Sequence, residues 1–309
     1  MIDVFDVPNL GVYNKVFYPN SSSWQVWKKP SNIKFIYFYV IGSGGAGGGG
    51  RTGNINTGGG GGGGASSSIS VGLFPAFLLP DTLYIQVGLG LNGAIANQGA
   101  SSGQLSYVSV APNTTAINIV MQSGNVSAGG GGGGTSSLAG VGGTAGTIWT
   151  YANFPLAEMG MVTSVGGQNG ASGGTTVSVG GSVTPTLPIS GGAGGGGESS
   201  SVQSFAGGNI IGSGFLPTIS GGTNNVNTSL VNGNDGFISI VPTTESFLDL
   251  PLLFTGGSGG GACHTTGFTG GFGGDGSYGS GGGGGGASYN GTGGSGGRGG
   301  DGLILITCW

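Results

Sequence analysis

The stretch GACHTTGFTGGFGGDGSYGSGGGGGGASYNGTGGSGGRGG, residues 261–300, has glycine at every third position except His264 and Ser288. Counted from Gly261, glycine fills 12 of 14 positions in this phase, and only four and five positions in the other two. The polyproline II helix has this three-residue period and no internal hydrogen bonds. Collagen shares the period but relies on proline, which is absent here. Because every peptide group still needs partners, we expect a packed lattice of polyglycine II helices.

Apolar clusters of strand length alternate with the glycine runs. Pro75 and Pro80 indicate that residues 73–79 form neither a long helix nor a central strand. No amphipathic helix is evident. The predicted fold class is therefore mainly β, with short strands in sheets, packed polyglycine II helices and little or no α-helix. We expect strands at 33–41, 83–89, 105–110, 116–121 and 303–306, the first of them buried because both of its faces are apolar.

Two segments end in the same phrase, an Asp-Gly pair followed by an apolar run. Asp235-Gly236 precedes Phe237, and Asp301-Gly302 precedes Leu303. Asp-Gly favours turns because glycine accepts a positive φ and aspartate bonds to the local backbone. We expect each pair to form a turn that ends a glycine region and starts a strand.

The first residues differ in composition from the rest of the chain. Residues 1–23 lack a glycine tract and are interpreted as a docking or anchor segment. Residues 24–309 are expected to form one glycine-rich domain of strands and polyglycine II helices, with two lobes at 24–245 and 246–309 as an alternative. Since ordering glycine costs roughly 0.5–1 kcal/mol per residue relative to alanine, the 81 glycines favour oligomerisation.

Charge and cysteine content limit the classes of partner. Six Lys and Arg against ten Asp and Glu leave no basic patch for nucleic acid. The apolar runs are too short to span a bilayer, where about 20 residues are needed, and the acidic start does not resemble a signal peptide. Cys263 and Cys308 are expected to be free thiols, because nothing indicates export into an oxidising compartment.

Motifs of enzymes occur only as by-products of the glycine content. Gly-x-Ser-x-Gly appears at 170–174, 256–260 and 293–297, but His264 is the only histidine available as a base. Cys263 and His264 supply two metal ligands, whereas a structural zinc site needs four. The carboxylates Asp81, Asp235, Asp275 and Asp301 stand in turn-like contexts, and Glu158, Glu198 and Glu245 are isolated, which disfavours a glycosidase pair. We expect no enzyme activity, cofactor or metal.

Aromatic residues between the glycines are the candidate binding residues. Phe268, Phe272, Tyr278 and Tyr289 interrupt the period-three region. Since a closely packed glycine lattice has no room for their rings, we expect all four to point outward. Such rings stack on sugars or anchor in a receptor, and they equally suit an apolar contact between protomers.

The order of these parts resembles the glycine-rich domain of bacteriophage tail and fibre proteins. The resemblance covers residues 24–309 and rests on the strand ending in glycine at 35–50, the segment 77–88 ending in Val87-Gly88, the segment 105–115 and the final Gly-Asp-Gly-Leu-Ile-Leu-Ile at 300–306. The phrases at 77–85 and 105–115 are similar to glycine-rich structural proteins from phages of aquatic bacteria. The resemblance implies packed polyglycine II helices with variable loops at one end that contact the host.

This resemblance implies a non-enzymatic virion protein, a tail fibre, fibre tip or head-fibre adhesin made in the host cytoplasm. The expected partners are further copies of the chain, with a trimer favoured, other virion proteins through residues 1–23, and a host surface glycan or outer-membrane protein. The alternatives are a purely architectural part, such as a capsid decoration or tail connector, and a self-assembling cellular filament.

Overall fold

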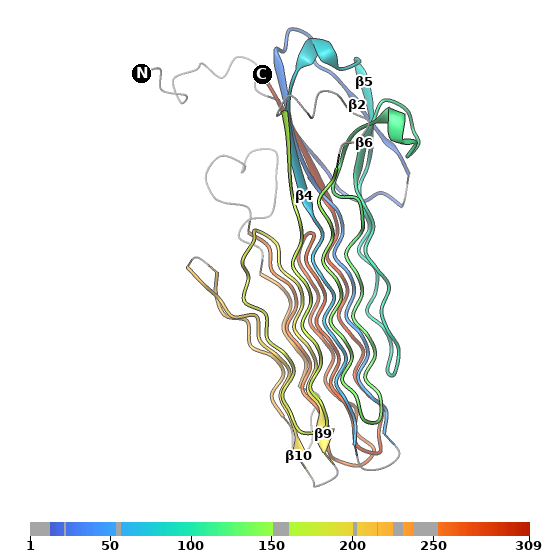
Figure 1. Cartoon of the computed structure of the whole chain (residues 1–309), viewed down its shortest axis with the longest axis vertical. Coiled ribbons are helices and arrows are strands. Elements are labelled where there is room, and N and C mark those ends of the chain that lie inside the picture. Colours follow the sequence, from blue (N-terminus) through green and yellow to red (C-terminus); the bar gives the residue numbers. More distant parts are fainter. Residues whose placement is uncertain are drawn as a thin grey trace.

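The computed structural model describes residues 13–21, 23–53, 57–150, 161–199, 203–214, 216–224, 231–237 and 253–309. Two antiparallel sheets occupy one half of an elongated molecule, and long glycine-rich segments run side by side through the other half (Figure 1). The mainly β fold class predicted from the sequence is confirmed, since the described helical elements are short 3₁₀ turns.

The larger sheet has five strands and joins both ends of the described chain. Its order is β1, β11, β3, β4 and β8, and every neighbouring pair is antiparallel. Strand β3 lies at the centre, and β11, the second strand in this order, pairs with β1 on one side and β3 on the other. The bounds are β1 Tyr13–Phe17, β3 Phe35–Ile41, β4 Ile69–Pro75, β8 Val162–Val165 and β11 Leu303–Cys308.

The smaller sheet has four strands in the order β2, β5, β6 and β7, again antiparallel. Two 3₁₀ turns, η2 (Ala76–Leu78) and η3 (Ala116–Asn118), connect strands at the sheet end. A two-stranded hairpin, β9 (Glu198–Ser199) and β10 (Gln203–Ser204), lies at the opposite end of the molecule (Figure 1). The bounds of the four strands are β2 Gln25–Lys28, β5 Thr82–Gln86, β6 Tyr107–Ser109 and β7 Ile119–Gln122.

The main core lies between the two sheets, which therefore form a sandwich. Ile36, Phe38 and Val40 of β3 alternate inward and are fully buried because successive strand residues face opposite sides. Phe38 packs edge-on against Phe74, with ring centroids 5.7 Å apart. The core also contains Trp27, Leu83, Ile85, Val108 and Met121 from the smaller sheet and Ile304 and Ile306 from β11.

The strands of the sandwich continue directly into the glycine segments. The chain leaves β3 into residues 42–53, and residues 57–68 lead back into β4. Each backbone N–H of the segment 42–53 donates to a different neighbour in turn: Gly45 to Ala65, Ala46 to Ser101 and Gly47 to Gly297. The cycle then repeats three residues further, with Gly48 to Gly62, Gly49 to Gln98 and Gly50 to Gly294.

The carbonyl groups of the same segment accept from three further segments. Gly282 donates to Gly45, Gly131 to Ala46 and Ala94 to Gly47. One segment is thus bonded to six neighbours, whereas a strand in a sheet has only two. This rotation of partners every three residues is the bonding that packed polyglycine II helices require.

Five segments, which we call the inner segments, each bond to six neighbouring segments. They are almost completely buried. Side chains are excluded there because the Cβ atom of an alanine at Gly47 or Gly282 would clash with the carbonyl oxygens of Gly283 and Gly297. The inner segments are 42–53, 57–68, 189–198, 254–263 and 279–288.

Outer segments bond on fewer sides and carry side chains toward solvent at every third position. In the outer segment 268–279, Phe272 and Asp275 are exposed, whereas Gly271 and Gly274 are buried. Segment 291–302 follows the same rule, with Thr292 exposed and Gly294 and Gly297 buried. Exposed side chains at every third position therefore mark these outer segments.

The structure corrects the prediction that the Asp-Gly pairs form turns. Neither Gly236 nor Gly302 has a positive φ, and the chain continues through both pairs without a turn. Gly302 is required for another reason, because a Cβ atom there would lie 2.8 Å from the Ile41 carbonyl oxygen. Asp301-Gly302 does lead into a strand, β11, as predicted. The strand expected after Asp235-Gly236 lies outside the described residues from Ile238 onward.

Residues 73–79 form neither a long helix nor a central strand, as predicted. Residues 73–75 are the end of β4, where only β3 pairs with it because β8 pairs with residues 69–72 alone, and residues 76–78 form η2. The proposed boundary at 245/246 does not separate two bodies, because segment 279–288 bonds to segments 42–53 and 57–68. Within residues 1–23, the described strand β1 belongs to the sheet and Phe17 to the core.

Candidate binding surface

The loops at the lattice end, opposite the sheets, gather into one surface. Ser288 forms isolated bridges with both Thr52 and Cys263. The Gly267 N–H donates to the Asn290 carbonyl at 3.1 Å, and the Ser288 hydroxyl donates to the Phe268 carbonyl at 2.5 Å. Backbone groups and the Ser288 hydroxyl thereby hold loops from three distant parts of the chain against each other. We call residues 52–53, 263–268 and 288–292 the lattice tip.

Small polar and aromatic side chains cover the lattice tip. Thr266, Phe268, Asn290 and Thr292 are exposed. Asn290 has a φ of 51°, which asparagine tolerates better than most residues. Tyr, Ser, Asn and Gly are also the residues that antibody loops use, because they combine contact area with adaptable hydrogen bonding. The exposed groups of the tip are thus hydroxyls, amides and an aromatic ring.

The four aromatic candidates do not form a single cluster. Phe268 lies on the lattice tip and is 43% exposed, and Phe272 is 40% exposed on the side of the lattice. Tyr289 is half-buried at the tip, where its N–H donates to the Cys263 carbonyl at 2.8 Å. The outward orientation expected of Tyr278 is wrong. Its ring packs 5.5 Å from that of Phe254 and 6.0 Å from that of Tyr18, near the sheets.

The serines of the three Gly-x-Ser-x-Gly matches occupy lattice positions. Ser258 is fully buried, and its hydroxyl donates to the Ser220 carbonyl at 2.8 Å. It also accepts the Asn234 N–H at 2.7 Å. The hydroxyl therefore fixes the outer segment 231–237 to the inner segment 254–263. Ser172 and Ser295 lie on the outer segments 166–175 and 291–302.

Cys263 and His264 both lie at the lattice tip. Cys263 is buried and free, as is Cys308 in β11, which confirms the prediction of unpaired thiols. His264 is half-buried, and its Nδ1 has no hydrogen-bond partner. Across the described part of the chain, no three His, Cys, Asp or Glu side chains lie close enough to share a metal ion.

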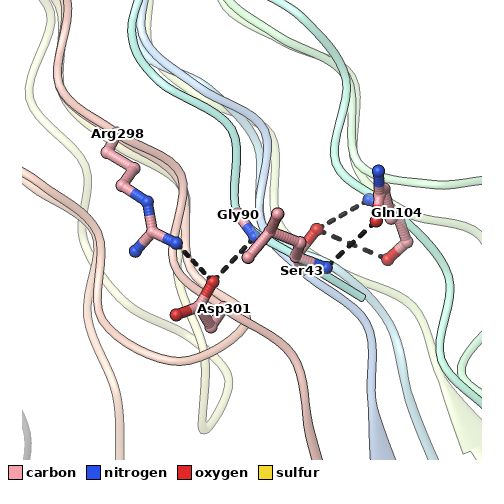
Figure 2. A network of polar contacts seen from close by, with 6 residues as sticks. Ser43, Gly90, Gln104, Arg298 and Asp301 are labelled. Carbon is pink, nitrogen blue, oxygen red and sulfur yellow. Dashed lines mark hydrogen bonds and ion pairs between the residues drawn. The ribbon is translucent and has the colours of Figure 1, made fainter. Parts of the chain in front are cut away.

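The aspartates that were predicted in turns act as links between segments. One carboxylate oxygen of Asp301 accepts the Gly90 N–H at 2.8 Å and a guanidinium N–H of Arg298 at 2.6 Å (Figure 2). Asp275 accepts the backbone N–H of Arg298 at 2.7 Å, and Asp235 accepts that of Asp275 at 2.9 Å. These carboxylates replace carbonyl acceptors at the lattice edge.

A second link in Figure 2 joins residues 43 and 104 at the start of the lattice. The Gln104 N–H donates to the Ser43 hydroxyl at 2.6 Å, and the Ser43 N–H donates to the Gln104 carbonyl at 2.9 Å. Polar side chains thus complete the hydrogen bonding where strands change into glycine segments.

Glu198 is the ionisable group that the sequence did not single out. It is 1% exposed, and its Oε1 lacks a hydrogen-bond partner. Its backbone exchanges two hydrogen bonds with Gly58, at 2.7 and 3.0 Å. Desolvation by burial raises the pKa of this carboxyl to about 7. Its position directly after the run Gly194–Gly197 is the one sequence signal that could have indicated burial.

No helix among the described residues is long and apolar enough to cross a membrane. In comparisons with known proteins, no protein-family model matches the chain and no curated protein matches it in sequence.

Proposed function

We propose that the protein is a non-enzymatic structural component of a bacteriophage virion, a fibre tip, tail fibre or head fibre that contacts the host cell with its lattice tip. The observation that carries this proposal is the bonding of five inner segments to six neighbours each. Such bonding makes a stiff, elongated support, and its short loops are gathered at one end. Recognition residues are typically found on loops that a rigid scaffold positions.

The phage assignment rests on the resemblance of residues 24–309 to glycine-rich tail and fibre domains. The chemistry of the lattice tip supports adhesion over catalysis, since its exposed groups are hydroxyls, amides and aromatic rings. The proposed ligand is a surface glycan or an outer-membrane protein of the host. In the proposed assembly the chain forms a trimer with further copies of itself. It binds other virion proteins through residues 1–23.

Competition for adsorption tests the proposal. Purified protein added to host cells is expected to block phage adsorption, and a variant with Thr266, Phe268 and Asn290 all changed to alanine is expected not to block it. A matched variant with three exposed residues changed at the sheet end, Val26, Val110 and Ile117, is the control. If the wild-type protein neither binds cells nor blocks adsorption, the receptor role is wrong.

A purely architectural role is the second candidate, because the lattice itself needs no ligand to explain its construction. Electron microscopy of intact particles separates the two. The proposed adhesin has its lattice tip pointing away from the particle, whereas a capsid or tail connector has both ends covered by neighbours. A cellular filament is the third reading, and finding genes for portal or tail-tube proteins next to the coding gene would contradict it.

A further inference from the structure

A cleft opens at the sheet end of the molecule, far from the lattice tip. It lies between the turn that connects β2 to β3 and the turn η2 before β5, which is drawn in cyan near the top of Figure 1. Its volume is about 560 Å³, within the range of about 300–1,000 Å³ that is usual for small-molecule sites. Lys28, Lys29, Ser31, Asn32, Phe77, Asp81 and Thr82 are among the lining residues.

Charge is distributed unevenly between the two halves of the described structure. The sandwich carries Lys15, Lys28, Lys29 and Lys34 against one carboxylate side chain, that of Asp81. The lattice carries two arginines against four carboxylates. Although the whole chain has a net charge of −4, the described sheet end is therefore basic, and the cleft lies within this basic part.

The two cleft lysines have different roles. The Lys29 ammonium donates to the carbonyls of Ala76 and Leu79 at 3.0 and 2.7 Å and lies 3.1 Å from the Asp81 carboxylate. The Lys29 ammonium is therefore fully engaged by these three groups, and it fixes the position of η2. Lys28 is exposed, and its ammonium has no ion pair or hydrogen bond among the described residues. Lys28 is the cation that is free to meet a ligand.

The aromatic residue of the cleft is presented to solvent. In η2 the neighbouring Ala76 is buried, whereas Phe77 is 84% exposed. Exposing a phenyl ring to water is unfavourable, and the ring offers a flat apolar face to a ligand. Phe77 stands beside hydrogen-bonding groups on both sides of the cleft, since Ser31 and Asn32 come from one turn and Thr82 and Asp81 from the other.

Asn32 is held in the left-handed region with a φ of 65°, an arrangement uncommon outside glycine that recurs at binding sites. The Asp81 side chain is 92% exposed even though it pairs with Lys29, so its carboxylate can still accept hydrogen bonds from a ligand.

The cleft therefore combines an apolar face, several neutral hydrogen-bonding groups, the Asp81 carboxylate as an acceptor and the Lys28 ammonium as a free cation. A sugar ring has an apolar face and a rim of hydroxyls, and an acidic sugar adds an anion for Lys28.

We propose that this cleft binds an anionic saccharide, with the ring stacked on Phe77, the acidic group at Lys28 and the hydroxyls at Asn32, Thr82 and Asp81. The site is separate from the lattice tip and does not rest on the proposed phage function.

Calorimetric titration of the full chain tests the site with three named probes: trigalacturonate, which carries carboxylates, mannose 6-phosphate, which carries a phosphate, and neutral maltotriose. Binding of either anionic probe is expected, with the two arms identifying the acidic group. Phe77→Ala is expected to weaken binding roughly tenfold, and Lys28→Gln roughly threefold with loss of most of the salt dependence.

Ile117→Ala is the matched control, because Ile117 is equally exposed, at 84%, and lies on η3 outside the cleft. It is expected to leave binding unchanged, and unchanged melting temperatures of all three variants show that they fold. The proposal is overturned if no anionic probe binds, if Phe77→Ala binds as tightly as the wild type, or if maltotriose binds equally well. Equal binding of a hexaglutamate peptide also overturns it, since charge alone would then explain the attraction.

Discussion

The carboxylate of Asp301 accepts the backbone N–H of Gly90 at 2.8 Å, across 211 positions of sequence (Figure 2). The same oxygen receives a guanidinium N–H of Arg298. This pair lies where the last outer segment enters β11, which lies between β1 and β3 in the larger sheet. One side chain thus joins the segment after β5 to the segment before β11, and so connects the smaller sheet to the larger one through the lattice.

Asp301→Ala is expected to destabilise the protein by about 1–3 kcal/mol. It leaves the partly buried Gly90 N–H without its acceptor and Arg298 without its ion pair. Denaturant unfolding measures the change. Asp301→Asn keeps an acceptor oxygen and should lose less, so equal stability of the alanine variant and the wild type would contradict this role.

Inner glycines are expected to tolerate no side chain. Gly282→Ala places a Cβ atom against the Gly297 carbonyl oxygen, and because six neighbours fix the segment, the backbone cannot move away. We expect a loss of about 3 kcal/mol or more, or failure to fold, and Gly282→Val should be worse. Thermal unfolding and soluble yield measure the effect.

Gly99→Ala is the control for this substitution, because the nearest atom to its new Cβ would be 3.7 Å away, an ordinary contact distance. Gly99 is exposed and has no positive φ. Its alanine variant should be as stable as the wild type. Equal stability of both alanine variants would mean that the inner segments are not packed as described.

The sequence predicted the mainly β fold class and the strands β3, β5, β6, β7 and β11, because apolar clusters identify them, and the glycine period indicated segments that bond through their backbones. It did not predict β1, β2, β4 or β8. It did not predict which segments are neighbours. In a lattice held by backbone groups, Gly47 and Gly283 present the same atoms as any other glycine, so side chains do not specify the pairing. The sandwich and the loops set the register instead, and these long-range relationships are not visible in a local pattern.

The candidate site was predicted in part. Phe268 is exposed at the lattice tip because an outer segment ends there, as the interrupted glycine period indicated. Tyr278 follows the same pattern but is covered, because Phe254 and Tyr18 reach it from segments remote in sequence. Its role as a receptor contact is therefore disfavoured, and that of Phe268, Phe272 and Tyr289 stays a prediction.

Both thiols are expected to be unreactive in the folded protein. Cys263 and Cys308 are 3% and 1% exposed, and burial raises the pKa of Cys308 above its usual range, which lowers its thiolate fraction. A chromogenic disulfide reagent should modify neither cysteine under native conditions and both after unfolding. Fast modification of a native thiol would show that its segment opens.

Stability is expected to fall as the pH rises from about 4.5 to about 7. The pKa of Glu198 is raised from 4.5 to about 7 in the folded protein, so across this interval the folded state holds a proton that the unfolded state has released. The loss of stability is complete above pH 7, where Glu198 is ionised in both the folded and the unfolded state.

Glu198→Gln is neutral at every pH and of similar shape, and it should stabilise the protein at pH 8 by roughly 1–3 kcal/mol while leaving it nearly unchanged at pH 4. Melting temperatures of both proteins at these two pH values measure the difference. A Glu198→Gln variant that is no more stable than the wild type at pH 8 would mean that the carboxylate finds a partner in the folded state.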